Sequence, residues 1–366
     1  MHEREKNKKS ALKVIEGVEH PSPINKEAVN KFIRKKISLL NADEYVKGIL
    51  EKNRTILSQA ITLVESSLPQ HHKIAQKIIE KCLPHAGNSI RIGITGTPGV
   101  GKSTFIESLG VLLSAQNRNI AVLAIDPSSM KSKGSILGDK TRMEDLSTKE
   151  NVFIRPSPSA GSLGGVARKT KEIIILCEAS GFDTIFVETV GVGQSEIAVH
   201  SMVDFFLLLM LAGAGDELQG IKRGIMEMAD AIVINKADGD NISKAKLAKR
   251  EFQNALHLFP PTESTWIPKV KLCSSITKTG ITQIWEMILD YIELTKSTKF
   301  FTENRLRQEK NIMFATINQT LKDNFYSNNN ISKIIPELEK EVLSGKISAY
   351  IAAQKLFDKY FDQITR

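Results

Sequence analysis

Residues 93–104 read GITGTPGVGKST, and they constrain the fold more than any other stretch of the chain. They hold the pattern Gly-x-x-x-x-Gly-Lys-Ser between an apolar run and a helical pattern. Such a turn points successive backbone N–H groups at phosphate oxygens, and the positive end of the following helix adds to the attraction. The motif requires a strand before it and a helix after it. The sequence therefore predicts a strand, a phosphate-binding loop and a helix in direct succession.

The loop also predicts the first contacts with a nucleotide. We expect the ammonium group of Lys102 to reach the β- and γ-phosphates and to act in hydrolysis, and the hydroxyl of Ser103 to bind Mg²⁺. The predicted nucleotide-binding residues of the loop are Gly96, Thr97, Pro98, Gly99, Val100, Gly101, Lys102, Ser103 and Thr104.

Short apolar runs alternate with helical patterns through the middle of the chain. Buried parallel strands are typically continuous apolar runs, and strands that alternate with helices favour a sheet covered on both faces. The predicted strands are residues 90–95, 120–125, 152–154, 184–187, 205–211, 231–234 and 270–273. The sequence therefore predicts an α/β fold with a mostly parallel central sheet flanked by helices.

Both ends of the chain carry apolar residues at helical spacing. The N-terminal part predicts helices over residues 26–40, 45–64 and 71–82, and the C-terminal pattern runs from 331 to 364 after a turn, YSNNN. We therefore expect helical extensions on either side of the sheet. The predicted segments are a polar tail (1–22), an N-terminal helical segment (23–85), the nucleotide-binding domain (86–295) and a C-terminal helical arm (296–366).

Composition narrows the classes of partner. The net charge is +9, but the excess lies in the two helical extensions, and only 6% of the residues are aromatic. A nucleic-acid-binding protein more commonly combines a focused basic patch with aromatic side chains, so we expect no nucleic-acid partner. No run reaches the roughly 18 apolar residues of a spanning helix, so we expect no membrane span.

The start of the chain and the cysteines bear on location. The first ten residues, MHEREKNKKS, mix both charge signs and lack an apolar core, which is unlike a secretory or transit segment. Cys82, Cys177 and Cys273 are too few and too scattered for a disulfide framework or a zinc site. We therefore expect a cytoplasmic protein.

The segment INKAD, directly after the predicted strand 231–234, predicts which base is bound. The Asp238 carboxylate can accept hydrogen bonds from guanine N1–H and N2–H₂, and adenine offers no such pair of donors. Lys236 can lie along the base, and Asn235 can connect this segment to the phosphate loop. Ser274 and Ser275 stand at the end of the last predicted strand. A backbone N–H at this place usually binds guanine O6, but the two serines can equally belong to an ordinary polar loop. The sequence therefore predicts GTP and GDP as ligands.

Glu188 and Gly191 follow another predicted strand, in the segment ETVGVGQSE. A carboxylate at a strand end can hold Mg²⁺ or its water, and the N–H of Gly191 can bind the γ-phosphate. Gln194 is the candidate for positioning the attacking water, although the usual place is directly after Gly191, where this chain has Val192. We therefore predict slow unaided hydrolysis. Asp126 and Asp139 are further acids that can approach the metal; as isolated residues, such acids are more commonly caps and loop residues.

Seven segments between residues 96 and 240 together resemble the MeaB/ArgK family, which includes the MMAA-type proteins, within the SIMIBI class of P-loop GTPases. In order, they are GTPGVGKST, AIDPSS, GSILGDKTRM, PSAGSLGGVA, ETVGVGQSE, DELQGIKRGIMEMAD and NKADGD. The similarity extends more loosely over the helical flanks and so covers most of the chain.

The resemblance implies a homodimer formed through the C-terminal arm and slow, partner-stimulated hydrolysis of GTP with Mg²⁺. It implies a chaperone that gates adenosylcobalamin loading and protects or reactivates methylmalonyl-CoA mutase, or that serves another cobalamin-dependent enzyme. By position, Asp126, Asp139 and Glu188 match the family's metal-site acids. Residues 215–224 match a mobile segment that couples the nucleotide to the partner, with Asp216, Lys222 and Arg223 as its charged members.

Three other functions remain open at this stage. A GTPase that delivers nickel or another metal centre would favour a Cys/His cluster, and only His71 and His72 stand together. A targeting GTPase of the signal-recognition type would favour a Met-rich domain. A P-loop kinase linked to basic amino-acid transport would use ATP, against which the guanine-reading segment argues.

Overall fold

The computed structural model describes residues 39–126, 143–158, 163–189, 195–213, 223–260 and 262–364. The chain divides into two compact units, residues 1–41 and 42–366, and the second unit holds the fold described below. The predicted polar tail lies outside the described residues, and so does all but the end of the predicted helix 26–40.

The centre of the larger unit is a seven-stranded sheet in which every neighbouring pair is parallel. The strands are β1 (Ile90–Gly96), β2 (Ile120–Asp126), β3 (Val152–Pro158), β4 (Thr184–Thr189), β5 (Phe205–Leu211), β6 (Ala231–Asn235) and β7 (Lys269–Leu272). Their order across the sheet is β3-β2-β4-β1-β5-β6-β7. All seven predicted strands are therefore confirmed, and so is the α/β class with a parallel sheet.

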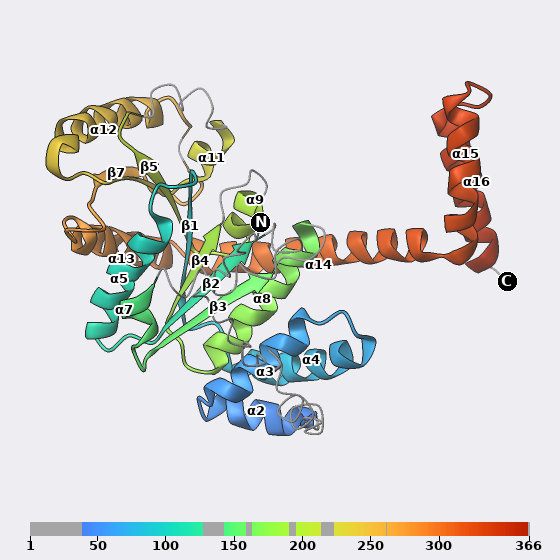
Figure 1. Ribbon diagram of the computed structural model, residues 1–366, viewed down its shortest axis with the longest axis horizontal. Coiled ribbons are helices and arrows are strands. Elements are labelled where there is room, and N and C mark those ends of the chain that lie inside the picture. The colour runs from blue at the N-terminus through green and yellow to red at the C-terminus, as the bar shows by residue number, and fades with distance from the viewer. Residues whose placement is uncertain are drawn as a thin grey trace, which may run out of the picture. The chain divides into compact units, whose positions relative to one another are not determined.

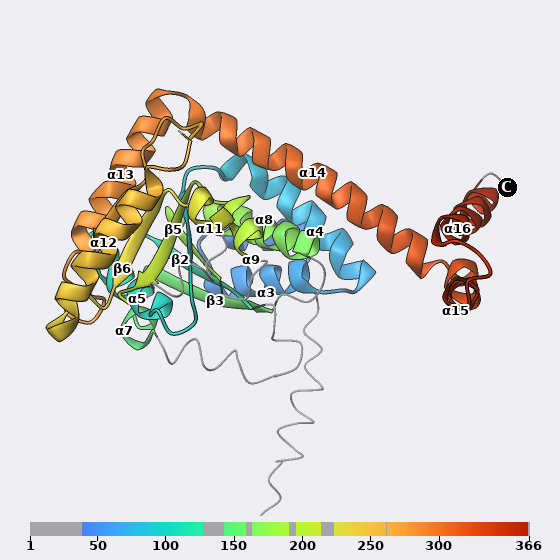
Figure 2. The ribbon, with the colours of Figure 1, turned by 90° about the horizontal axis from the view of Figure 1, so that it is seen from above.

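Helices cover both faces of this sheet (Figure 2). The helices between and after the strands are α5 (Lys102–Ala115), α7 (Glu144–Ser147), α8 (Leu163–Ala179), α9 (Ser195–His200), α11 (Arg223–Met228), α12 (Ile242–Leu256) and α13 (Ile281–Ser297). On one face, α5 and α13 pack against β1 and β5 in the main core, to which Ile94, Phe105 and Ile288 belong. On the other face, α9 packs closely on β1, so that a Cβ at Gly93 would lie only 2.8 Å from the side chain of Val199.

The N-terminal part of the unit contains three helices, α2 (Ala42–Leu50), α3 (Arg54–Glu65) and α4 (Pro69–Cys82), and α3 and α4 pack against α8. The prediction of one helix over 45–64 is wrong, because the chain breaks between α2 and α3. Lys52 adopts a positive φ of 60°, and the Asn53 side chain accepts hydrogen bonds from the N–H groups of Thr55 and Ile56. An N-cap of this kind starts a new helix even though the apolar spacing continues.

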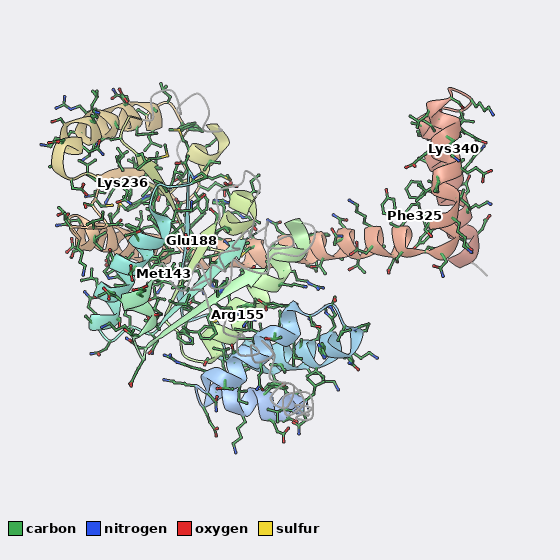
Figure 3. The ribbon with its side chains drawn as sticks, in the orientation of Figure 1. Met143, Arg155, Glu188, Lys236, Phe325 and Lys340 are labelled. Carbon is green, nitrogen blue, oxygen red and sulfur yellow. The ribbon has the colours of Figure 1, made fainter. Side chains whose placement is uncertain are left out.

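The C-terminal part consists of α14 (Phe300–Ser327), α15 (Asn329–Leu343) and α16 (Ala349–Ile364) (Figure 1). The continuous pattern predicted over 331–364 is two helices, separated where Gly345 takes a φ of 72°. Figure 3 shows Phe325 at the far end of α14, where its ring packs on the rings of Phe357 and Tyr360. Within the described residues, no helix is long and apolar enough to cross a membrane.

At its amino edge, the sheet repeats one arrangement three times. Asp183, Asp204 and Asp230 directly precede β4, β5 and β6. Each aspartate forms two hydrogen bonds with one residue at the start of the adjacent strand: its backbone N–H donates to that residue's carbonyl, and its carboxylate accepts that residue's N–H. The pairs are Asp183 with Asn119, Asp204 with Arg91, and Asp230 with Phe206, and all six distances are 2.8–3.0 Å. The carboxylates thus bind N–H groups that begin a strand and would otherwise lack a partner.

The amino edge also holds α14 in place. Arg305, in the second turn of α14, donates from Nε and Nη2 to the two carboxylate oxygens of Asp204, each at 2.7 Å. Its guanidinium also donates to the carbonyls of Gly87 and Ser89. Charge-assisted, two-pronged contacts of this kind fix orientation as well as distance.

Candidate nucleotide site

The phosphate loop leaves β1 at Gly96 and enters α5 at Lys102, at the carboxyl edge of the sheet. Gly96 has a φ of 150°, and a Cβ there would lie 2.4 Å from the carbonyl oxygen of Leu209. Gly101 has a φ of 94°, and a Cβ there would lie 2.8 Å from Nδ2 of Asn235. Both positions therefore exclude a side chain, which is the physical reason for glycine at the two ends of the motif.

Lys102 is buried, and its ammonium group donates to the loop's own carbonyls, to Gly96 at 2.8 Å and to Thr97 at 3.3 Å. Burial lowers the pKa of Lys102, and the nearby carboxylates of Glu188 and Glu196 oppose that shift. The hydroxyl of Thr97 is buried and has no hydrogen-bond partner among the described residues. The loop therefore presents donors that a phosphate group can satisfy.

Ser103 and Glu188 lie together beneath the loop. The Ser103 hydroxyl donates to Oε1 of Glu188 at 3.0 Å, and Glu188 belongs to β4, the strand next to β1 (Figure 3). A hydroxyl and a carboxylate at one place are the oxygen donors that Mg²⁺ prefers. The structure therefore brings together two of the four predicted metal ligands.

Several predicted residues cannot be placed as fully. Asp126 ends β2, two residues beyond Ala124, which pairs with Glu188 in the sheet; its side chain lies outside the description. Asp139, Gly191, Gln194 and the segment 214–222 lie outside the described residues. Their assignments stay predictions.

The guanine-reading segment follows β6 and contacts the phosphate loop directly. Nδ2 of Asn235 donates to the carbonyl of Val100 at 2.9 Å, and Nζ of Lys236 donates to the carbonyl of Gly99 at 2.9 Å. These two contacts join loops that are about 135 residues apart in sequence. The predicted connection between Asn235 and the phosphate loop is present in the structure.

The carboxylate of Asp238 lies beside the loop that follows β7. It accepts a hydrogen bond from the Ser274 hydroxyl, which in turn accepts the N–H of Thr277 at 3.1 Å. The backbone N–H of Ser275 donates to Oδ1 of Asn235 at 3.1 Å. To bind guanine O6, as predicted, this N–H would have to donate to both oxygens at once or release Oδ1 of Asn235.

Two residues near the site were not predicted from the sequence. Glu196, in the first turn of α9, is buried and close enough to Lys102 to affect its pKa. Ser108, on α5, is buried and donates to the carbonyl of Ser275 at 2.6 Å. Glu196 ends the segment ETVGVGQSE, which offered a signal; Ser108 lies in no motif, and only the packing of α5 against the β7–α13 loop identifies it.

A parallel sheet with a phosphate loop after β1, joined to an Asn-Lys-x-Asp segment after β6, defines a P-loop GTPase. The family model described as "Methylmalonyl Co-A mutase-associated GTPase MeaB" matches residues 57–330, and the chain belongs to this family. Hydrolysis of GTP and binding of guanine nucleotides follow from that membership.

Named relatives and a solved structure agree with this family. A "Probable GTPase" of Mycobacterium bovis is 46% identical over 306 residues, which cover 84% of this chain and 91% of the relative. The mouse protein named "Methylmalonic aciduria type A homolog, mitochondrial" is 43% identical over 87% of this chain and 79% of its own length. A structure titled "Crystal structure of LAO/AO transport system kinase" has a TM-score of 0.72 and 35% identity, covering 88% of this chain and 99% of that one.

Proposed function

We propose that this GTPase is a chaperone that uses slow GTP hydrolysis to gate adenosylcobalamin loading of methylmalonyl-CoA mutase, or of another cobalamin-dependent enzyme, and to protect or reactivate it. The observation that carries the guanine-dependent part is the pair of hydrogen bonds from Asn235 and Lys236 to the phosphate loop. They make base binding and phosphate binding parts of one site. The client rests on the family name and on the mouse relative's name.

In this proposal, nucleotide binding draws Lys102 away from the carbonyls of Gly96 and Thr97 and onto the β- and γ-phosphates. Its charge then stabilises the negative charge of the transferring phosphoryl group. Asp238 reads guanine N1–H and N2–H₂, and Lys236 lies along the base. Gly191 donates to the γ-phosphate, and Gln194 positions the water.

Ser103 and Glu188 would hold Mg²⁺, with Asp126 and Asp139 as the further acids of the site. The hydroxyl and carboxylate that lie 3.0 Å apart fit such an ion. When bound, Mg²⁺ would neutralise phosphate charge.

The homodimer is the second part of the proposal, with residues 86–295 as the GTPase domain and 296–366 as the dimerisation arm. Its support is a set of exposed apolar side chains on α14: Leu306, Met313, Phe314, Ile317 and Leu321. Exposed apolar rows of this kind are typical of protein interfaces. Sedimentation of the double variant Ile317→Glu/Leu321→Glu should show a monomer where the unmodified protein is a dimer; a monomer in both cases would remove the arm from assembly.

The proposed location is the cytoplasm. All three cysteines, Cys82, Cys177 and Cys273, are free and buried, which suits a reducing compartment.

The deciding experiment measures GTP turnover by the purified protein, alone and with a methylmalonyl-CoA mutase from the same source, with ATP as the control nucleotide. We expect turnover with GTP only, well below about 1 s⁻¹ unaided and faster with the mutase; unaided GTPases of this slow type work at roughly 10⁻⁴–10⁻² s⁻¹. GTP turnover that ignores the mutase would contradict the proposed client and direct the search to metal-centre assembly. Transfer of phosphate to an acceptor other than water would contradict the chaperone.

A further inference from the structure

Ser275, in the loop between β7 and α13, uses every one of its polar groups to bind other parts of the nucleotide site. Its N–H and its hydroxyl both donate to Oδ1 of Asn235, at 3.1 and 2.9 Å. Its carbonyl accepts the hydroxyl of Ser108 at 2.6 Å. Both serines are buried. Ser275 is therefore held from two sides, by the strand end that carries Asn235 and by helix α5.

These contacts form a closed path that begins and ends at the phosphate loop. Val100, in the loop, accepts Nδ2 of Asn235 at 2.9 Å. Asn235 accepts from Ser275, and Ser275 accepts from Ser108, which lies on the helix that the phosphate loop itself begins. Since α5 is covalently continuous with that loop, each member of the path is positioned relative to the bound phosphates.

The path continues to the base reader. Ser274 is the residue before Ser275, and its hydroxyl donates to the Asp238 carboxylate. The N–H of Ala237 donates to the carbonyl of Cys273 at 2.9 Å, so the two loops also pair through their backbones. The position of the β7–α13 loop therefore determines where the Asp238 carboxylate stands.

We infer that the Ser108 and Ser275 hydroxyls are positioning groups for guanine selection, because together they fix the base-reading loop against helix α5. This inference rests on the proposed role of Asp238 as the reader of the base. Hydrogen bonds weaken steeply when their angle or distance is poor, so a small shift of the Asp238 carboxylate lowers affinity for guanine specifically. Contacts to the phosphates come from the phosphate loop and are unaffected.

The test uses the full-length variants Ser108→Ala and Ser275→Ala and measures dissociation constants for GTP and ATP by calorimetry or by competition with a fluorescent nucleotide. Each substitution should weaken GTP binding about fivefold to tenfold, the effect of one neutral hydrogen bond. ATP binding should change by less than about twofold, because it depends on the phosphates. The KM for GTP should rise in both variants in proportion to the loss of affinity.

Ser114→Ala is the matched control. Ser114 is on the same helix, is comparably buried, and donates its hydroxyl to Oδ1 of Asn151 at 2.7 Å, away from the base-reading loop. It should lower the melting temperature without changing the ratio of GTP to ATP affinity. The conservative variant Ser275→Thr retains a hydroxyl and should restore most of the GTP affinity lost in Ser275→Ala.

Equal losses of GTP and ATP affinity, or a preserved GTP affinity in both alanine variants, would overturn the inference. Asp238→Asn separates this outcome from failure of the base reader. If Asp238→Asn weakens GTP binding while the serine variants do not, only the positioning role fails. If Asp238→Asn leaves GTP binding unchanged, the proposed base reader itself fails.

Discussion

The two edges of the sheet are built in opposite ways. At the amino edge, the N–H groups that begin strands are bound by Asp183, Asp204 and Asp230, and the guanidinium of Arg305 extends this pairing to α14. At the carboxyl edge, the backbone turns through positive φ angles at Gly96 and Gly101, and among the described residues Lys102 donates to carbonyls of its own loop.

The difference shows how one sheet separates stability from function. The carboxylates of Asp183, Asp204 and Asp230 at the amino edge are satisfied by fixed partners within the fold, which stabilises it. Donors at the carboxyl edge are held ready for a ligand. Substitutions at the two edges should therefore have separable effects, on unfolding at one edge and on nucleotide binding and turnover at the other.

Lys102→Ala should give the largest effect, confined to the carboxyl edge. Loss of the charge that faces the phosphates should lower GTP turnover by about 10³-fold, the upper range for removing one group that stabilises a transition state. The melting temperature should change little, because the loss of the two hydrogen bonds to Gly96 and Thr97 is offset by removal of a charge that burial disfavours. Phosphate release and a thermal melt measure both quantities, and normal turnover would remove Lys102 from the mechanism.

Glu178→Gln should give the largest effect at the amino edge. Glu178 accepts from Nε and Nη2 of buried Arg91, at 2.8 and 3.0 Å. Burial alone would raise the pKa of Glu178, but the hydrogen bonds and charge of Arg91 outweigh it and hold the pKa low. The variant leaves a buried guanidinium without its counter-ion, so the free energy of unfolding should fall by about 3 kcal/mol.

Denaturant titration measures this loss, and turnover per folded molecule should persist. Asp290→Asn, which breaks the exposed pair with Lys269, is the control and should change the free energy of unfolding by less than about 1 kcal/mol. Equal effects of the two substitutions would contradict the special contribution of the buried pair to stability.

Asp238→Asn sharpens the comparison within the carboxyl edge. The variant replaces a charged acceptor of two hydrogen bonds, so the affinity for GTP should fall about 30-fold, or about 2 kcal/mol. Discrimination against xanthine nucleotide should relax, because the xanthine ring offers an acceptor where guanine has its amino group. Calorimetry with both nucleotides tests this, and unchanged GTP affinity would refute the assignment.

Asp230→Asn should give the smallest effect, visible only as a change with pH. Burial raises the pKa of Asp230 to about 7, so the folded state retains a proton that the unfolded state loses near pH 4. Stability of the unmodified protein therefore falls as pH rises from about 4 to 7 and then levels off. The free energy of unfolding of Asp230→Asn, relative to that of the unmodified protein, should therefore rise by about 1 kcal/mol between pH 6 and pH 8. Parallel stability–pH curves for the two proteins would contradict this prediction.

The sequence predicts the sheet well, because buried parallel strands are continuous apolar runs and all seven were recognisable. It predicts less well where helices end, since the breaks at Lys52 and Gly345 depend on single backbone conformations within continuing apolar patterns. The phosphate and guanine motifs identify their residues by spacing. Ser108 belongs to no motif, and its contact with Ser275 spans 167 residues, so only the folded chain reveals it.

The amino edge of the sheet also has a recognisable sequence pattern. An aspartate stands directly before β4, β5 and β6, at Asp183, Asp204 and Asp230. The pattern predicts a hydrogen-bond acceptor at the start of each strand. The partner of each carboxylate depends on the order of the strands in the sheet, which the neighbouring sequence does not determine. Asp204 shows this best, because its two partners, Arg91 and Arg305, lie 113 residues before it and 101 residues after it.

The hydrogen bonds from Lys102 to Gly96 and Thr97 bear on how quickly the protein exchanges its nucleotide. When a nucleotide leaves, the ammonium group returns to two carbonyls of the loop instead of remaining buried without acceptors. The empty protein is thereby stabilised, which weakens nucleotide affinity and lowers the free energy that dissociation requires. Because these two carbonyls accept from Lys102 in place of phosphate oxygens, their hydrogen bonds set part of the free energy of nucleotide exchange.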